Sequence, residues 1–317
     1  MTTPLKVRIG AVAWCVFVYF SVPSLQHNRW AHALLLLAAL VLVPMAWCLA
    51  RDESDTGRVL QLRRLAGRLQ LPAALVLIGA FLLPVGLPAF LCALPWVLVI
   101  GLMAIVGVLR VVRRPLLPLA QLVRDAGLIF TVVGGVWLLA DRAGLRPLGF
   151  SPDIVLLTAV HFHFAGLVLP VVTGLVLARH PQSRAAQWSA WGVLVGVPLV
   201  AAGISAVQLG WGGAIECLAA VVLVLSAWGV AWQHVRLAVE EKSALRSSRI
   251  LWAIAAVALA AGMLLAGLYG VRGYLAPLPW LDIPWMRALH GTLNSIGFSL
   301  AALLAWCRSG RECSCGH

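Results

Sequence analysis

The sequence predicts an all-α fold: a polytopic bundle of transmembrane helices that makes up a single integral membrane domain over residues 1–317. Two features of the composition indicate this. Hydrophobic residues make up 62% of the chain, with a mean hydropathy of +0.96. Charged residues make up 11%, whereas an average soluble domain carries about 25%. In addition, apolar stretches of about 20 residues, the length that crosses a bilayer, recur along the whole chain.

Hydropathy divides the chain into about ten spans, and eight is the alternative if two of the short spans are re-entrant or interfacial. We expect the first span to be retained as a helix, because no small-residue cleavage site of a signal peptide separates it from the second. The ten ranges are 7–22, 30–49, 71–87, 89–109, 117–140, 154–178, 187–207, 212–235, 250–271 and 284–306.

The net charge of +13 comes from basic residues in short loops between spans, the pattern that orients a membrane protein, so we expect no nucleic-acid partner. With the N-terminus in the cytoplasm, most of the 24 Lys and Arg lie on the cytoplasmic side. An even number of spans then places both termini, and a short tail over 307–317, in the cytoplasm. This predicts a multi-pass protein of the inner (cytoplasmic) membrane, surrounded by the lipid bilayer. The remaining basic residues are Arg29, Arg142, Arg146, Arg272 and Arg287 on the outside and Arg124 within a span.

The longest loops, 50–70 and 236–249, are charged and too short to hold a catalytic domain. The function is therefore expected to lie within the membrane. The sequence shows no nucleophile–base pair, phosphate-binding loop or carboxylate pair, so it leaves open whether the protein catalyses a reaction. Titratable groups are costly in hydrocarbon, and each intramembrane polar residue is for that reason a candidate for function.

Four polar side chains in two spans are the main candidates for a binding site. At ~1.5 Å per helical residue, His161 and His163 lie about 10–14 Å into the sixth span, counted from its outer end. His290 and Asn294 lie about 9 and 15 Å into the tenth span, counted from the same side. The four residues are therefore predicted to share a layer in the outer half of the membrane, where they can meet.

Helix geometry decides which of these side chains act together. Residues i and i+2 lie about 200° apart around a helix, so His161 and His163 face different neighbours and do not bind one metal ion together. His290 and Asn294, at i and i+4, share one face. The spacing leaves open which of His161 and His163 faces inward. A plainer alternative is that these residues only form hydrogen bonds between helices.

The stretch HFHFAG, residues 161–166, resembles the H-F-H-Y motif of haem–copper oxidase subunit I, in which two histidines of one helix ligate two different haems. The stretch LHGTLNSIGF, residues 289–298, resembles the helix of those enzymes that supplies the other axial ligand of the low-spin haem. The resemblance implies a b-type haem with His290 and one of His161 or His163 as axial ligands. The further histidines of a copper site are missing, so we expect no oxygen-reducing centre, and we assign no residue as the ligand of a separate metal ion.

Two longer stretches carry a second resemblance. LLTAVHFHFAGLVLPVVTGL (156–175) and MRALHGTLNSIGFSLAALLAW (286–306), in this order, are similar to the YndJ-like family of bacterial membrane proteins. The resemblance covers the second half of the chain and implies a membrane protein of many spans. The family is sometimes described as transporters, but the resemblance implies no mechanism and assigns no functional residues.

Further ionisable residues lie near the ends of spans. Asp125 in the fifth span and Glu216 in the eighth are candidates for a proton relay. If residues 115–123 are interfacial because of their prolines, however, the span begins near Ala126 and Arg124 reaches back to the cytoplasmic surface. Glu216 has a plainer role as well, because an acidic residue at a helix start suits the positive end of the helix dipole.

Three classes of function stay open. The first is a membrane protein that binds haem or a metal at the histidine layer, and exchanges electrons with a quinone or senses a small ligand. The second is a small-solute or proton-coupled transporter, and the third is an accessory membrane protein whose histidines only pack. Transporters are usually built from repeated halves with broken helices, and the sequence shows neither. A haem needs two histidines at one depth, which are present, so the first class is favoured.

Overall fold

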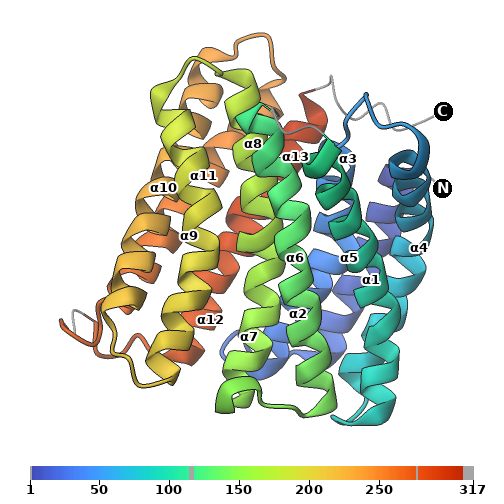
Figure 1. The fold of residues 1–317 in the computed structure, drawn as a ribbon, viewed down its shortest axis with the longest axis vertical. Helices are drawn as coiled ribbons and strands as arrows, with labels where there is room; N and C mark the ends of the chain where they lie inside the picture. The colour runs from blue at the N-terminus through green and yellow to red at the C-terminus, as the bar shows by residue number, and fades with distance from the viewer. Residues whose placement is uncertain (1, 114–117, 276–277, 310–317) are drawn as a thin grey trace.

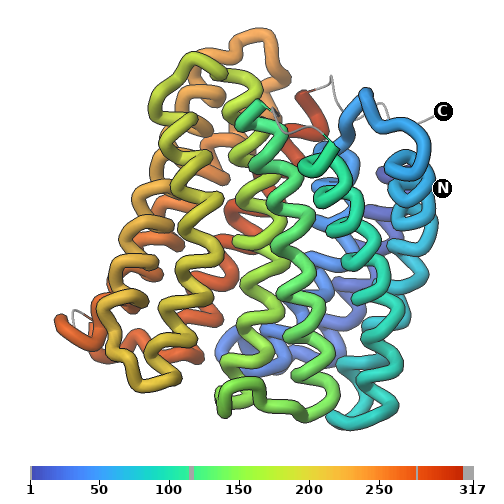
Figure 2. Tube along the Cα trace, viewed as in Figure 1, coloured from blue at the N-terminus to red at the C-terminus, as the bar shows by residue number. Residues whose placement is uncertain are grey.

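The structure is a computed structural model that describes residues 2–113, 118–275 and 278–309. These residues form ten helical spans long and apolar enough to cross a membrane, as the sequence predicts. Figures 1 and 2 show the spans packed side by side in one bundle. Most of the predicted tail 307–317 lies outside the described residues. The spans are α1 (Thr3–Ser21), α2–η1–α3 (Asn28–Leu49), α4 (Gly57–Leu82), α5 (Leu87–Arg113), α6 (Leu119–Ala143), α7–η3–α8 (Pro152–Arg179), α9 (Arg184–Gln208), α10 (Ala214–Glu240), α11 (Arg246–Gly270) and α12–η4–α13 (Ile283–Arg308).

Two of the spans form the core of the bundle. In the most apolar 18-residue window of Asn28–Leu49, 94% of the residues are buried, and in that of Pro152–Arg179 the share is 72%. The corresponding share in α1 is 11%, so this helix lies on the periphery. In the core, α2 contacts both α7 and α12, which brings spans far apart in the sequence together.

Three spans of the described chain are not regular α-helices from end to end. Each changes to a π-helix and then returns to α-helix. Such wider turns are rare and often lie at functional sites. The three π-helical segments meet, because η4 contacts both η1 and η3. The elements are α2 (Asn28–Leu37), η1 (Ala38–Leu42) and α3 (Val43–Leu49); α7 (Pro152–His163), η3 (Phe164–Val168) and α8 (Leu169–Arg179); and α12 (Ile283–Thr292), η4 (Leu293–Leu300) and α13 (Ala301–Arg308).

The third span differs from its predicted range. The helix α4 begins at Gly57, well before the predicted start at residue 71. Hydropathy misses this first part because it carries four arginines, but basic side chains on an exposed helix face do not oppose helix formation. One of them, Arg63, lies over the ring of Trp47 at 4.5 Å and so packs this extension against α3.

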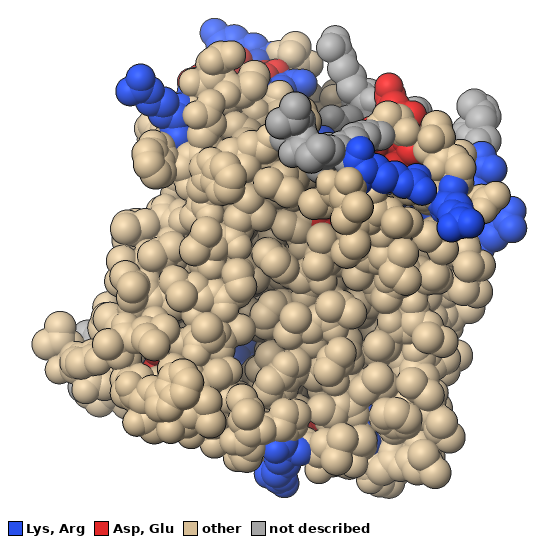
Figure 3. Space-filling view, in the orientation of Figure 1, with Lys and Arg blue, Asp and Glu red and all other residues tan. Residues whose placement is uncertain are grey.

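Charged side chains are concentrated at one end of the bundle. In Figure 3 most of the visible charges lie along the top rim, the end that carries the connections 50–56, 180–183 and 241–245, and fewer lie at the lower end. We call this end the basic face. Below it, most of the visible surface carries no charge. The arrangement agrees with the charge bias of the sequence, and we expect the basic face to lie in the cytoplasm.

The peripheral helix α1 is attached through a few specific contacts. Its Trp14 donates a hydrogen bond of 2.7 Å to the carbonyl oxygen of Ala33, and its Lys6 donates one to the carbonyl oxygen of Gly67. Between them, Gly10 lies directly against the backbone of Leu40, and a Cβ atom at this position would overlap the carbonyl group there. Glycine therefore sets the distance between α1 and η1.

We predict that Gly10→Leu destabilises the protein, because α1 has to move away from η1. Overpacking of this kind costs about 1–3 kcal/mol. The measurement is the midpoint of thermal unfolding of the detergent-solubilised protein. Gly101→Leu in α5 is the control, because a Cβ there meets no atom within 4 Å. Equal midpoints for the two variants would contradict the contact.

Candidate functional site

Three of the four predicted polar residues of spans six and ten line one cavity of about 500 Å³. Ligand pockets generally measure about 300–1,000 Å³, so a small molecule fits. The walls are mostly apolar and come from helices of both halves of the chain, including α2, α6, α9, α10 and α11. Among the predicted site residues the lining includes His161, His290, Asn294 and Glu216, but neither His163 nor Asp125.

His161 lies on the cavity wall, near the end of α7 where the span changes to the π-helix η3. Its ring lies edge-on to that of Phe162, with ring centroids 5.9 Å apart. Its Nε2 atom is buried and has no hydrogen-bond partner in the described part of the chain. Buried polar atoms nearly always have such a partner. This nitrogen is therefore available to a molecule in the cavity.

His163 has a different environment, because both of its ring nitrogens are engaged. Nε2 accepts a hydrogen bond of 3.1 Å from the indole nitrogen of Trp96 on α5. An indole N–H can only donate, so Nε2 carries no proton and the proton sits on Nδ1. Nδ1 donates to the carbonyl oxygen of Ala159 at 2.8 Å. His163 is therefore fully hydrogen-bonded and joins α7 to α5.

His290 and Asn294 occupy one face of the last span and contact each other. Nδ1 of His290 lies 2.8 Å from the carbonyl oxygen of Gly262 on α11, so it donates there and Nε2 keeps its lone pair. The Asn294 side-chain nitrogen donates to the backbone oxygen of His290 at 3.0 Å and lies 3.4 Å from Nε2. These contacts orient the imidazole of His290.

Glu216 lies in the first turn of α10 and lines the same cavity. Its Oε1 accepts a hydrogen bond of 3.1 Å from Nη1 of Arg272, and the two side chains are 18% and 41% exposed. The carboxylate is therefore already paired with a cation at a partly solvated position. A proton relay through Glu216 stays a prediction.

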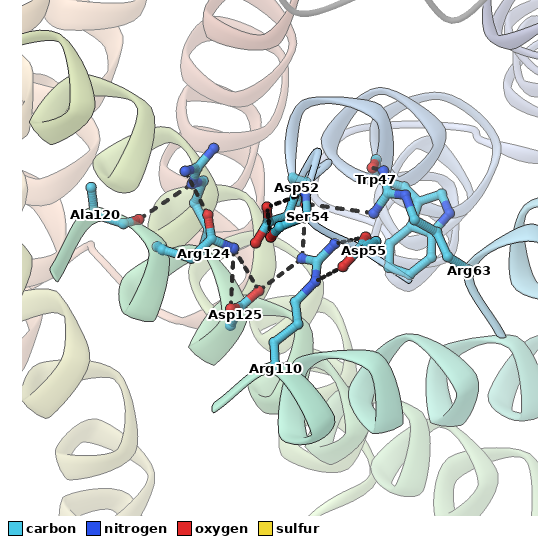
Figure 4. A network of polar contacts seen from close by, with 11 residues as sticks. Trp47, Asp52, Ser54, Asp55, Arg63, Arg110, Ala120, Arg124 and Asp125 are labelled. Atoms are coloured by element: carbon cyan, nitrogen blue, oxygen red, sulfur yellow. Dashed lines mark hydrogen bonds and ion pairs between the residues drawn. The ribbon is translucent and has the colours of Figure 1, made fainter. Parts of the chain in front are cut away.

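Asp125 belongs to a separate cluster towards the basic face, where Figure 4 shows Arg110 between two carboxylates. Arg110 donates to Asp125 Oδ1 at 2.9 Å and to the two oxygens of Asp55 at 2.9 and 2.6 Å. Asp125 is fully buried and Arg110 is 2% exposed. Gln121 donates to both oxygens of Asp125 at 3.1 Å. The cluster is therefore a buried ion-pair network that fixes the loop 50–56 on α5 and α6.

The helix α6 runs without a break from Leu119, and a membrane-embedded part that begins near Ala126 stays a prediction. Arg124 lies within that helix and is only partly exposed. It donates to Oε1 of Gln121 at 2.6 Å and to the carbonyl oxygen of Ala120 at 3.3 Å. These two hydrogen bonds hold the guanidinium group of Arg124 against its own helix. Hydropathy alone does not detect such contacts.

The possible cofactor ligands are few. The described residues contain no group of three or more His, Cys, Asp or Glu side chains that could hold a metal ion. The b-type haem that the sequence resemblance implies would be held by two histidines. Since His163 is engaged, His161 and His290 are the two imidazoles on the cavity wall that could hold one.

The model of the YndJ-like protein family matches residues 33–298. The chain belongs to the YndJ-like family. It is 26% identical over 309 residues to the uncharacterized membrane protein YndJ of Bacillus subtilis (strain 168). That match covers 94% of this chain and 52% of the Bacillus protein, so the chain spans about half the length of this relative. No solved structure matches. The YndJ-like match extends well into the first half, where the motifs in the sequence gave no resemblance.

Two buried residues of this YndJ-like chain escaped the sequence analysis. The charge count places Arg287 on the outside, at the outer end of the tenth span, but it is 5% exposed on the cavity wall. Its spacing could have predicted this position, because residues 287, 290 and 294 share one helix face. His234 is also fully buried and lies 6.1 Å from Phe298, measured between ring centroids. Its place near the end of the eighth span concealed it.

We predict that Arg110→Leu strongly destabilises the protein, because it leaves two buried carboxylates without their cation. Removing one partner of a buried ion pair costs about 3–5 kcal/mol. Asp125→Asn should cost less, since the pair between Arg110 and Asp55 remains. The midpoint of thermal unfolding in detergent is the measurement.

The control for this prediction is Arg236→Leu. Arg236 forms an exposed ion pair with Glu240 at 3.0 Å, and exposed pairs contribute little to stability. If Arg110→Leu lowers the midpoint no more than Arg236→Leu does, the network does not stabilise the fold.

Proposed function

We propose that the protein binds a small, mostly apolar molecule inside the membrane, in the cavity lined by His161, His290 and Asn294, and that it acts in sensing or redox chemistry. One observation carries the proposal: the buried Nε2 atom of His161 has no partner in the described chain and lies on the same cavity as His290. A mostly apolar cavity with a few convergent polar groups is the usual form of a ligand site.

Three kinds of occupant suit such a cavity. A b-type haem would be held by His161 and His290 and would supply one-electron chemistry. A quinone would accept hydrogen bonds through its carbonyl oxygens from His161 and from the side-chain amide of Asn294, which contacts His290. A lipid-like molecule would lay its chain along the apolar walls and place its head near the polar residues. In each case His161 and His290 contribute to binding.

Transport of a small solute, with or without coupled protons, is the second candidate. It is favoured by the three π-helical segments that meet in the core, because interrupted helices commonly surround transporter sites. Asp125 and Glu216 are then the candidate proton carriers. The test is uptake of a bound probe into vesicles that contain the protein, with a pH gradient of either sign. Uptake equal to that of protein-free vesicles would exclude this candidate.

We predict that the purified protein binds at least one of three probes with a stoichiometry of one: haemin, a short-chain naphthoquinone or palmitate. His161→Ala and His290→Ala should each weaken that binding by about tenfold, equivalent to about 1.4 kcal/mol. The measurements are absorbance for haemin and quenching of tryptophan fluorescence for the other two, in nanodiscs of a zwitterionic lipid.

The matched control is His234→Ala. His234 is buried like His161 and also has an Nε2 atom without a partner in the described chain, but it does not line the cavity. This variant should bind as the wild type does. The proposal is wrong if no probe binds, or if the variants of His161 and His290 bind as tightly as that of His234.

A further inference from the structure

Arg287 places a buried positive charge on the wall of the cavity. It lies on α12 one turn before His290, and it is 5% exposed. One end of the guanidinium is held, since Nη2 donates to the carbonyl oxygen of Gln26. Its Nε atom is buried and has no hydrogen-bond partner among the residues that the structure describes.

No carboxylate of the described chain forms an ion pair with Arg287. Two acidic residues, Asp153 and Asp282, attract it from a longer distance. Each of them has another partner: Asp153 accepts a hydrogen bond of 2.8 Å from Asn28, and Asp282 accepts one of 3.0 Å from the backbone nitrogen of Trp285. A buried charge without a close partner is costly in a membrane protein, so a compensating anion is expected.

Arg287 belongs to the polar side of a cavity whose other walls are mostly apolar. Positions 287, 290 and 294 form a polar stripe along one face of the last span. The rest of the wall is mostly apolar, with Leu34, Met263 and Phe298 among its members. A molecule that fills this space therefore meets a cation and hydrogen-bonding groups on one side and hydrocarbon on the others.

We propose that Arg287 is the anion-binding subsite of the cavity, and that the ligand has an apolar body and a carboxylate that accepts hydrogen bonds from the guanidinium. This inference rests on the proposed function and narrows it, because a neutral quinone would leave the charge uncompensated. Two sources share this chemistry, the head of a long-chain fatty acid and a propionate of haem. Arginine suits either, since its N–H groups match the geometry of a carboxylate.

The first test compares palmitate with hexadecanol, which has the same chain and a neutral head. Each is titrated into the full chain in phosphatidylcholine nanodiscs, with partition into empty nanodiscs subtracted. We expect the wild type to bind palmitate about 10- to 100-fold more tightly than hexadecanol, the range typical of a charge-assisted hydrogen bond. This comparison needs no variant, so it does not depend on whether a variant folds.

The second test is Arg287→Gln, which should remove the preference for palmitate and leave the binding of hexadecanol unchanged. Arg287→Lys keeps the charge without the planar group and should bind palmitate several-fold more weakly than the wild type. Arg146→Gln is the matched control, since Arg146 is exposed and does not line the cavity. It should keep the full preference.

A third arm titrates haemin into the same four proteins. If haemin binding depends on Arg287 and palmitate does not bind, the carboxylate is a haem propionate; the reverse result identifies a fatty acid, and both support the subsite. If palmitate and hexadecanol both bind the wild type with equal affinity, or if Arg287→Gln leaves the binding of palmitate and haemin unchanged, the subsite is overturned while the proposed function stands. If palmitate, hexadecanol, haemin and the naphthoquinone all fail to bind, the proposed function and the subsite are both wrong.

Discussion

A polar group that enters a bilayer needs a partner within the protein, since no water is there to provide one, and this constraint governs how the spans are joined. Trp96 and His163 join α5 to α7, and Gln70 joins α4 to η1 through a hydrogen bond of 2.7 Å to the carbonyl oxygen of Ala39. Hydrogen bonds of this kind hold the bundle together. The unsatisfied atoms of His161 and Arg287 stand out against that background, because both residues line the cavity.

Glycine is what allows several of these polar side chains to fit between closely packed helices. A Cβ on Gly134 would lie 2.9 Å from Nδ1 of His163, and one on Gly262 would lie 2.6 Å from the side-chain nitrogen of Asn294. In both places the missing side chain leaves room for the polar residue of the neighbouring helix. The polar residues and the glycines opposite them therefore act as pairs, although they are distant in the sequence.

The number of spans could be predicted from the sequence because hydropathy sums over many residues and tolerates local exceptions. The opposite faces of His161 and His163 could also be predicted, since they follow from helical periodicity alone. Hydropathy does not report how a helix is rotated about its axis, and that rotation decides which histidine faces the cavity. The same limit concealed the burial of Arg287 on the cavity wall, since the charge count places this residue on the outside, and it concealed the pairing of Arg110 with Asp125. The π-helical segments leave no clear mark in hydropathy at all.

Those segments have a consequence for how the protein can change in evolution. A π-helical turn holds one residue more than an α-helical turn, and each residue of an α-helix turns the chain by about 100°. The rotation of α7 about the helix axis is therefore partly independent of the rotation of α8. Gaining or losing a residue within Phe164–Val168 would rotate the half of the span that carries His161, while the half that packs on α6 through Gly174 kept its place. Relatives can thus acquire different cavities on the same frame of helices.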